Sequence, residues 1–176
     1  MTKSSETAYD LVVFGATSFV GQILTRYLLE TYGVGQSVKW AIAGRSESKL
    51  NTLKGELGSK AKDLPMILAD ASDEAALKAM CEQTRVIIST VGPYALYGEP
   101  LVQACVRSGT DYCDLTGEVQ WIRKMVERYE EEAKSSGARI VHCCGFDSIP
   151  SDMGVWFLQN QAEQTFGAPC RDVRMR

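Results

Sequence analysis

The most informative part of the chain is residues 11–21, Leu11-Val12-Val13-Phe14-Gly15-Ala16-Thr17-Ser18-Phe19-Val20-Gly21. Its four apolar residues predict a buried strand, and Gly15 predicts a tight turn where that strand ends. Apolar residues then recur at helical spacing from Val20 onward, so a helix follows at once. The start of a helix binds anions, because its first N–H groups have no partner within the helix and its dipole favours negative charge.

The pyrophosphate of a dinucleotide is an anion that suits this turn. Gly15 lets the chain turn sharply, and Gly21 lets the helix pack close to the strand. Ser18 stands at the position of the middle glycine in a Gly-x-x-Gly-x-x-Gly pattern. Its small side chain still lets a phosphate approach, and its hydroxyl can donate a hydrogen bond or cap the helix. An ordinary strand-to-helix turn would use the same glycines. We expect the dinucleotide to contact Gly15, Ala16, Thr17, Ser18, Phe19 and Val20.

The composition is that of a globular protein. The chain has 176 residues, 45% of them hydrophobic and 23% charged, which suits one domain with a sizeable core. A formal net charge of −3 gives no electrostatic case for binding nucleic acid. No apolar run approaches the length of a membrane span, and the N-terminus is polar. We therefore expect a cytoplasmic protein that does not bind nucleic acid.

Strand-like and helix-like segments alternate along the chain. After the first strand, further strands are expected at residues 38–43, 65–69, 86–91, 112–115 and 139–144. This alternation predicts parallel pairing through right-handed crossovers, and hence a doubly wound, Rossmann-like α/β fold with helices on both faces of the sheet. We assign residues 1–9 to a flexible lead and residues 10–165 to this domain.

The residues after the second strand indicate which dinucleotide binds. An acidic side chain there favours NAD, whereas an Arg accommodates the 2′-phosphate of NADP. The sequence has Gly44, Arg45 and Ser46, and Arg is a permanently charged, bidentate partner for phosphate. Ser46 is also a candidate N-cap for the next helix. We expect NADP; the alternative is that Arg45 is a surface residue beside a capped helix.

Other strand ends supply further candidates for the cofactor site, since ligands of such sheets bind beyond the carboxyl ends of the strands. Asp70 could accept a hydrogen bond from the adenine amino group, or it could simply form a turn. The residues expected to lie along the cofactor are Ser89, Val91, Gly92 and Pro93.

The six cysteines predict neither a disulfide framework nor a metal site. Most of them lie in apolar runs, which is typical of core thiols. His142, Cys143 and Cys144 are adjacent, and neighbouring residues of a strand point to opposite faces, so they would not converge on one ion. His142 is expected to be a buried, neutral side chain.

Several motifs together resemble the saccharopine dehydrogenase-like oxidoreductases. They are Gly15–Gly21, Ala43-Gly44-Arg45, Val91-Gly92-Pro93-Tyr94, Tyr112-Cys113-Asp114-Leu115-Thr116-Gly117-Glu118 and Gly145-Phe146-Asp147-Ser148-Ile149-Pro150-Ser151-Asp152. The nearest branch contains the trans-acting enoyl reductases of bacterial lipid synthesis and the saccharopine dehydrogenase-like oxidoreductase of animals. The resemblance implies the N-terminal NADP-binding domain of a longer protein.

This resemblance also implies an activity and partners. It suggests NADPH-dependent reduction, for instance of an enoyl group in a lipid or polyketide precursor, with a lipid-like small molecule as substrate. Family members have a second domain for substrate and dimer contacts, so we expect residues 166–176 to begin the crossover to it, with Val173 starting a strand. A homodimer through that domain and membrane association of the whole protein are further expectations.

Two other functions remain open from the sequence: a non-catalytic NADP-binding sensor or scaffold, and an amino-acid dehydrogenase of the saccharopine type. The latter needs Arg or Lys for substrate carboxylates, and the segments after the strands have few. For catalysis, Tyr94 and Tyr97 are the preferred proton donors, because both are expected in a loop beyond the nicotinamide half of the site. Packing at a domain interface is the alternative, and it is the more common role of aromatic side chains.

Overall fold

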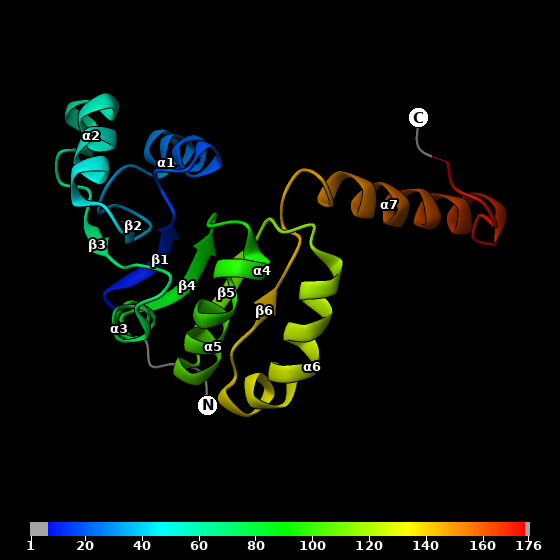
Figure 1. The fold of residues 1–176 in the computed structure, drawn as a ribbon. Helices are drawn as coiled ribbons and strands as arrows, with labels where there is room; N and C mark the ends of the chain where they lie inside the picture. The colour runs from blue at the N-terminus through cyan, green and yellow to red at the C-terminus, as the bar shows by residue number, and fades with distance from the viewer. Residues whose placement is uncertain (1–6, 175–176) are drawn as a thin grey trace.

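The computed structural model describes residues 7–174, which form one parallel sheet of six strands (Figure 1). The strand order is β3-β2-β1-β4-β5-β6, so the direction of winding reverses between β1 and β4. The strands are β1 (Tyr9–Phe14), β2 (Trp40–Gly44), β3 (Met66–Leu68), β4 (Thr84–Ser89), β5 (Asp111–Asp114) and β6 (Ile140–Val141). The predicted doubly wound, Rossmann-like sheet is confirmed.

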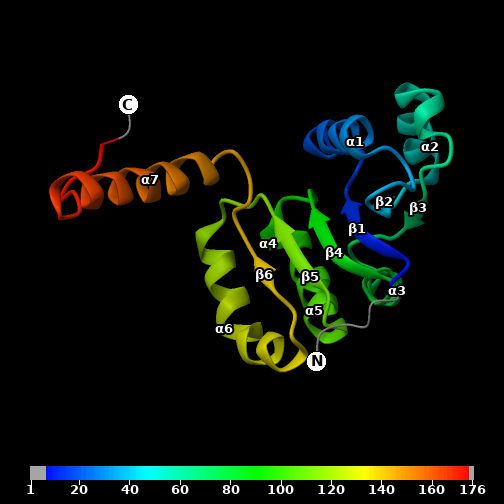
Figure 2. The same cartoon turned by 180° about the vertical axis from the view of Figure 1, so that it is seen from behind.

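Helices connect successive strands and cover both faces of the sheet, as Figures 1 and 2 show from opposite sides. They are α1 (Phe19–Tyr32), α2 (Glu47–Leu57), the 3-10 helix η1 (Ser59–Ala61), α3 (Glu74–Glu82), α4 (Tyr94–Tyr97), α5 (Glu99–Ser108), α6 (Val119–Ser136) and α7 (Ile149–Phe166). Gly109 and Gly137 end α5 and α6 in the left-handed conformation that glycine adopts without strain.

The sheet separates two hydrophobic cores. Val12 and Val13 are both fully buried, yet they belong to different cores because consecutive strand residues point to opposite faces. Val13 packs with Leu50 and the other residues under α1 and α2, whereas Val12 packs with Ile87 and Leu101 under α3, α5 and α6. Burial on both faces explains why the central strands are apolar throughout.

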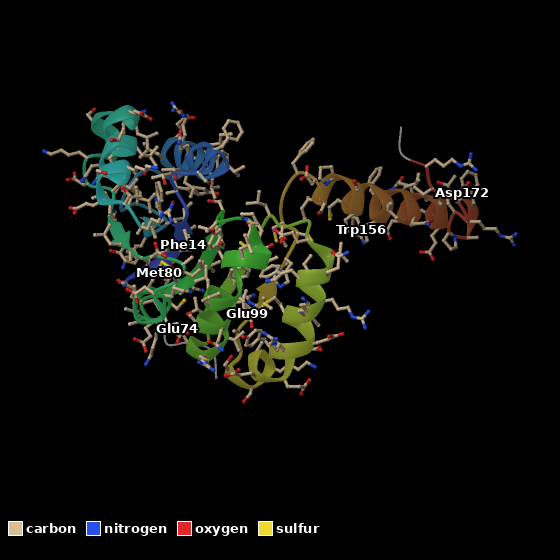
Figure 3. The ribbon with its side chains drawn as sticks, in the orientation of Figure 1. Phe14, Glu74, Met80, Glu99, Trp156 and Asp172 are labelled. Atoms are coloured by element: carbon tan, nitrogen blue, oxygen red, sulfur yellow. The ribbon has the colours of Figure 1, made fainter. Side chains whose placement is uncertain are left out.

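Helix α7 lies outside these layers. It projects away from the sheet in both views, and its labelled Trp156 lies far from Phe14 at the end of β1 (Figures 1–3). Only Ala162 of this helix is buried, while Trp156 and Phe157 are each 61% exposed. The helix therefore presents apolar side chains that residues 7–174 do not cover. Within the same residues, no helix is both long and apolar enough to cross a membrane.

Several predicted bounds need correction. The last strand covers only Ile140–Val141, because Cys143 adopts a left-handed φ of 62° that no extended strand allows. His142 and the two cysteines after it therefore lie beyond the strand, and the alternation argument does not apply to them. Tyr94 and Tyr97, which were expected in a loop, begin and end the short helix α4.

The chain ends are described in part. Residues 1–6 of the predicted lead and residues 175–176 of the predicted crossover lie outside the described residues. Tyr9, also assigned to the lead, already belongs to β1. The predicted strand from Val173 stays a prediction, because residues 175–176 lie outside the described residues. The domain boundaries at 10–165 and 166–176 stay predictions.

Candidate functional site

The site is built first from the turn between β1 and α1. Ser18 is the N-cap of α1, and its hydroxyl accepts a hydrogen bond from the Gly21 N–H at 3.0 Å, so the predicted capping role is confirmed. The backbone N–H groups of Thr17, Phe19 and Val20 donate to no acceptor within residues 7–174. Unpartnered N–H groups at the start of a helix are suited to binding an anion.

Both glycines of this turn are required by the geometry. Gly15 has a φ of 86°, and a Cβ there would stand 2.7 Å from Cγ2 of Val91 and 2.8 Å from Oγ1 of Thr90. A Cβ at Gly21 would overlap the carbonyl oxygen of Gly15. The sharp turn at Gly15 and the close packing of helix on strand at Gly21 agree with the roles predicted for these residues.

Thr90, directly after β4, contacts this turn through hydrogen bonds that the sequence analysis did not predict. Its hydroxyl donates to the Gly15 carbonyl at 2.9 Å and lies 2.9 Å from the Ser18 hydroxyl. The Ser18 hydroxyl accepts from the Gly21 N–H and can donate its own proton to the Thr90 hydroxyl, while the Thr90 proton goes to the Gly15 carbonyl. The Ser18 hydroxyl is then committed within the protein, and Thr90 ties the end of β4 to the turn after β1. The available signal was a hydroxyl directly after an apolar strand.

The residues directly after β2 are a helix cap, Ser46, and the exposed Arg45. Ser46 caps α2 by accepting from the Lys49 N–H at 3.4 Å, as predicted. Arg45 is exposed, and its guanidinium forms no salt bridge or hydrogen bond within residues 7–174. Its charge is therefore available to a ligand. A Cβ at Gly44 would meet only Leu50 at an ordinary 3.7 Å, so packing does not require that glycine.

Asp70, after β3, forms a turn. One of its oxygens accepts from both the backbone N–H of Ser72 at 2.9 Å and the Ser72 hydroxyl at 2.7 Å. These bonds to Ser72, with a smaller contribution from the charge of Arg45, lower the pKa of the Asp70 carboxyl. The turn accounts for Asp70 without the adenine contact, which stays a prediction. The cap of α3 is instead Asp73, which accepts from the Ala76 N–H at 3.0 Å.

The two tyrosines proposed for proton transfer differ in their surroundings. Tyr94 is only 6% exposed, and its hydroxyl donates to the Ser89 carbonyl at 2.9 Å and accepts from the Leu115 N–H at 3.4 Å. Burial raises the pKa of Tyr94 to about 12. These contacts favour a packing role for Tyr94. Tyr97 is 48% exposed and remains accessible.

A buried network after β5 and β6 was also missed. Asp114 is 2% exposed, and its carboxylate accepts from the Tyr112 hydroxyl at 2.9 Å and from the Thr116 and Cys143 N–H groups at 3.1 Å each. Nδ1 of His142 lies 2.7 Å from the same carboxylate. The side chain of His142 is 8% exposed, so its predicted burial is confirmed, although it lies in a loop and not in a strand.

Comparison with known proteins agrees with this geometry. The family model "Saccharopine dehydrogenase NADP binding domain" matches residues 11–141. The chain belongs to this family. It is 44% identical over 158 residues to a trans-acting enoyl reductase of Mycobacterium tuberculosis, and 43% identical over 161 residues to one of Mycobacterium ulcerans. These matches cover 90% and 92% of this chain.

The same matches cover 37% and 38% of the two mycobacterial proteins, so the chain spans little more than a third of their length. Among solved structures, the apo saccharopine dehydrogenase (L-Glu forming) of Saccharomyces cerevisiae superposes with a TM-score of 0.71 at 17% identity. That superposition covers 89% of this chain and 32% of the yeast protein. At this identity the likeness concerns the fold alone.

Proposed function

We propose that this chain binds NADPH, with the pyrophosphate at the start of α1 and the 2′-phosphate at Arg45. The observation that carries the proposal is the set of unpartnered N–H groups of Thr17, Phe19 and Val20 beside the tight turn at Gly15. Calorimetric titration with NADPH and, separately, with NADH tests it. We expect tighter binding of NADPH, and binding of neither nucleotide would contradict the proposal.

We propose further that the protein containing this chain reduces an enoyl group in a lipid-like or polyketide precursor. The support is its 44% identity to relatives named trans-acting enoyl reductase. The cofactor supplies the hydride when bound, and the chain's part is to orient the cofactor and exclude water. The test follows NADPH absorbance after addition of an α,β-unsaturated thioester to the full-length protein. No loss of absorbance above a saturated thioester control would contradict enoyl reduction.

For proton delivery, Tyr97 is the better candidate of the two tyrosines. Its hydroxyl is accessible, whereas the Tyr94 hydroxyl is held by the Ser89 carbonyl. In the full-length protein, Tyr97→Phe is expected to lower the rate of reduction about a hundredfold without changing NADPH affinity. Tyr94→Phe is the control and is expected to lower stability more than rate. An unchanged rate in Tyr97→Phe would leave water or another group as the donor.

We propose that substrate and dimer contacts are made by the part of the full-length protein that corresponds to the relatives' additional residues. The apolar side chains of α7, including Trp156 and Phe157, support this, because residues 7–174 leave them exposed. We propose also that the full-length protein is cytoplasmic and associates with membranes through that part. Gel filtration of the full-length protein with light scattering tests the dimer, and a monomer at micromolar concentration would contradict it.

A further inference from the structure

We propose that Glu118 is a positioning residue that fixes the turn after β4 for the nicotinamide half of the cofactor. The inference rests on the NADPH binding proposed above. Glu118 acts through the backbone of another element, since its carboxylate contacts neither the turn at Gly15 nor the end of β2.

The Glu118 carboxylate binds the start of α4 with both oxygens. One oxygen accepts from the Tyr94 N–H at 2.7 Å and the other accepts from the Ala95 N–H at 2.8 Å. Pro93, the N-cap residue of α4, provides no side-chain cap of its own. A half-buried residue from the β5–α6 loop thus supplies the cap that the local sequence lacks.

Glu118 is itself held by a short series of hydrogen bonds. Its N–H donates to the Thr116 hydroxyl at 3.1 Å, and the Thr116 N–H donates to the Asp114 carboxylate at 3.1 Å. The buried Asp114 receives further bonds from Tyr112 and from the loop after β6. The Glu118 carboxylate is therefore anchored to the sheet and provides a fixed point for α4.

The topology indicates which half of the cofactor this turn faces. A dinucleotide lies across the point where the strand order reverses, which here is between β1 and β4. With the 2′-phosphate bound at Arg45, as proposed above, the adenine half of the cofactor would lie on the β2 side. The nicotinamide half then lies over the end of β4, where residues 90–93 connect the strand to α4.

The two ends of the turn after β4 are held by different residues. Thr90 is fixed to the Gly15 carbonyl at 2.9 Å, whereas the far end of the same turn is fixed through Tyr94 and Ala95 to Glu118. Loss of the Glu118 carboxylate removes both bonds to the start of α4 and loosens the far end, although the Tyr94 hydroxyl still binds the Ser89 carbonyl, and it leaves the turn at Gly15 in place. The expected consequence is weaker binding of the nicotinamide half with the adenine half unaffected.

The test compares NADPH with adenosine 2′,5′-bisphosphate, which carries the adenine half and the 2′-phosphate but no nicotinamide. In Glu118→Ala we expect the dissociation constant of NADPH to rise about tenfold, the equivalent of one charge-assisted hydrogen bond. The dissociation constant of the bisphosphate is expected to change less than about twofold. Glu127→Ala, on the exposed face of α6, is the matched control and is expected to change neither.

Glu118→Gln serves as a second variant that keeps the side-chain shape. Its NH2 group replaces one of the two acceptor oxygens and cannot accept a hydrogen bond, so its effect on NADPH should lie between wild type and Glu118→Ala. Equal weakening of both ligands, or unchanged NADPH binding, would overturn the positioning role. Failure of the wild type to bind either ligand would overturn the proposed NADPH binding and this role with it.

Discussion

The starts of α1 and α4 have the same setting in the sheet but differ in whether a side chain binds their N–H groups. Each follows a central strand of the sheet, β1 or β4, through a turn that contains glycine. At α1 the N–H groups of Phe19 and Val20 are unpartnered within residues 7–174, whereas at α4 those of Tyr94 and Ala95 are bound by Glu118. A strand, a glycine and a helix start therefore leave N–H groups for an anion only where no side chain already binds them.

The largest expected effect comes from Gly15→Val, which blocks the open helix start. A Cβ at this φ of 86° would lie within 2.8 Å of Val91 and Thr90, so the turn cannot keep its shape. We expect NADPH affinity to fall at least about a hundredfold, the equivalent of roughly two lost hydrogen bonds to charged groups. The measurement is calorimetric titration, with circular dichroism to confirm that the chain stays folded.

Gly35→Ala is the matched control for this substitution. Gly35 also has a positive φ, 69°, but a Cβ there meets no atom within 4 Å. It should cost about 1–2 kcal/mol of unfolding free energy through backbone strain and leave NADPH affinity unchanged. Undiminished binding in Gly15→Val would contradict the role of the α1 start.

The next effect concerns the charge beside β2. Arg45→Ala is expected to weaken NADPH binding about 10- to 100-fold and to change NADH binding less than about twofold, because only NADPH carries the 2′-phosphate. Both affinities can be measured by quenching of intrinsic fluorescence. The control is Arg123→Ala, which removes an exposed arginine on α6 and should change neither affinity. Equal losses for the two nucleotides would assign Arg45 another role.

A smaller effect is expected from Thr90→Val, which removes the hydroxyl between the two helix starts. The Gly15 carbonyl then loses a bond of 2.9 Å, and the Ser18 hydroxyl loses its neighbour. Unfolding in urea should show a loss of about 1–2 kcal/mol, and NADPH affinity should fall about three- to tenfold. Thr52→Val, at an exposed position of α2, is the control. Unchanged affinity would mean that Thr90 does not shape the site.

The smallest effect concerns the turn at Asp70. Bonds from Ser72 lower the pKa of this carboxyl from its ordinary value of 3.8, so Ser72→Ala should raise it toward that value. Because the folded-state pKa is lowered, the stabilisation is present above the ordinary pKa and is lost as the pH falls through the folded-state value. NMR titration of the side-chain carboxyl measures the change. The backbone N–H of residue 72 still binds the carboxylate in this variant, so a pKa that does not move would leave only the Ser72 hydroxyl bond without an electrostatic role.

Features that depend on neighbours in sequence could be predicted. Ser18 and Ser46 cap their helices through N–H groups three residues away, which is a spacing visible in the sequence. The positive φ of Gly15 and the close packing at Gly21 followed from the same kind of local pattern.

Features that depend on distant residues could not be predicted. Glu118 reaches Tyr94 across 24 positions, and Asp114 reaches His142 across 28, so no local pattern marks either pair. The burial of Tyr94 likewise depends on how α4 folds back onto the end of β4. The last strand is shorter than predicted because Cys143 adopts a left-handed φ, and its N–H is bound by the distant Asp114 carboxylate.

An NMR titration of the backbone amides with NADPH tests the central comparison most directly. The account predicts that the amide signals of Thr17, Phe19 and Val20 shift strongly as NADPH is added, because their N–H groups gain phosphate acceptors. The Tyr94 and Ala95 amides should shift less, because Glu118 keeps them as NADPH binds. Unmoved signals at Thr17, Phe19 and Val20 under saturating NADPH would contradict it.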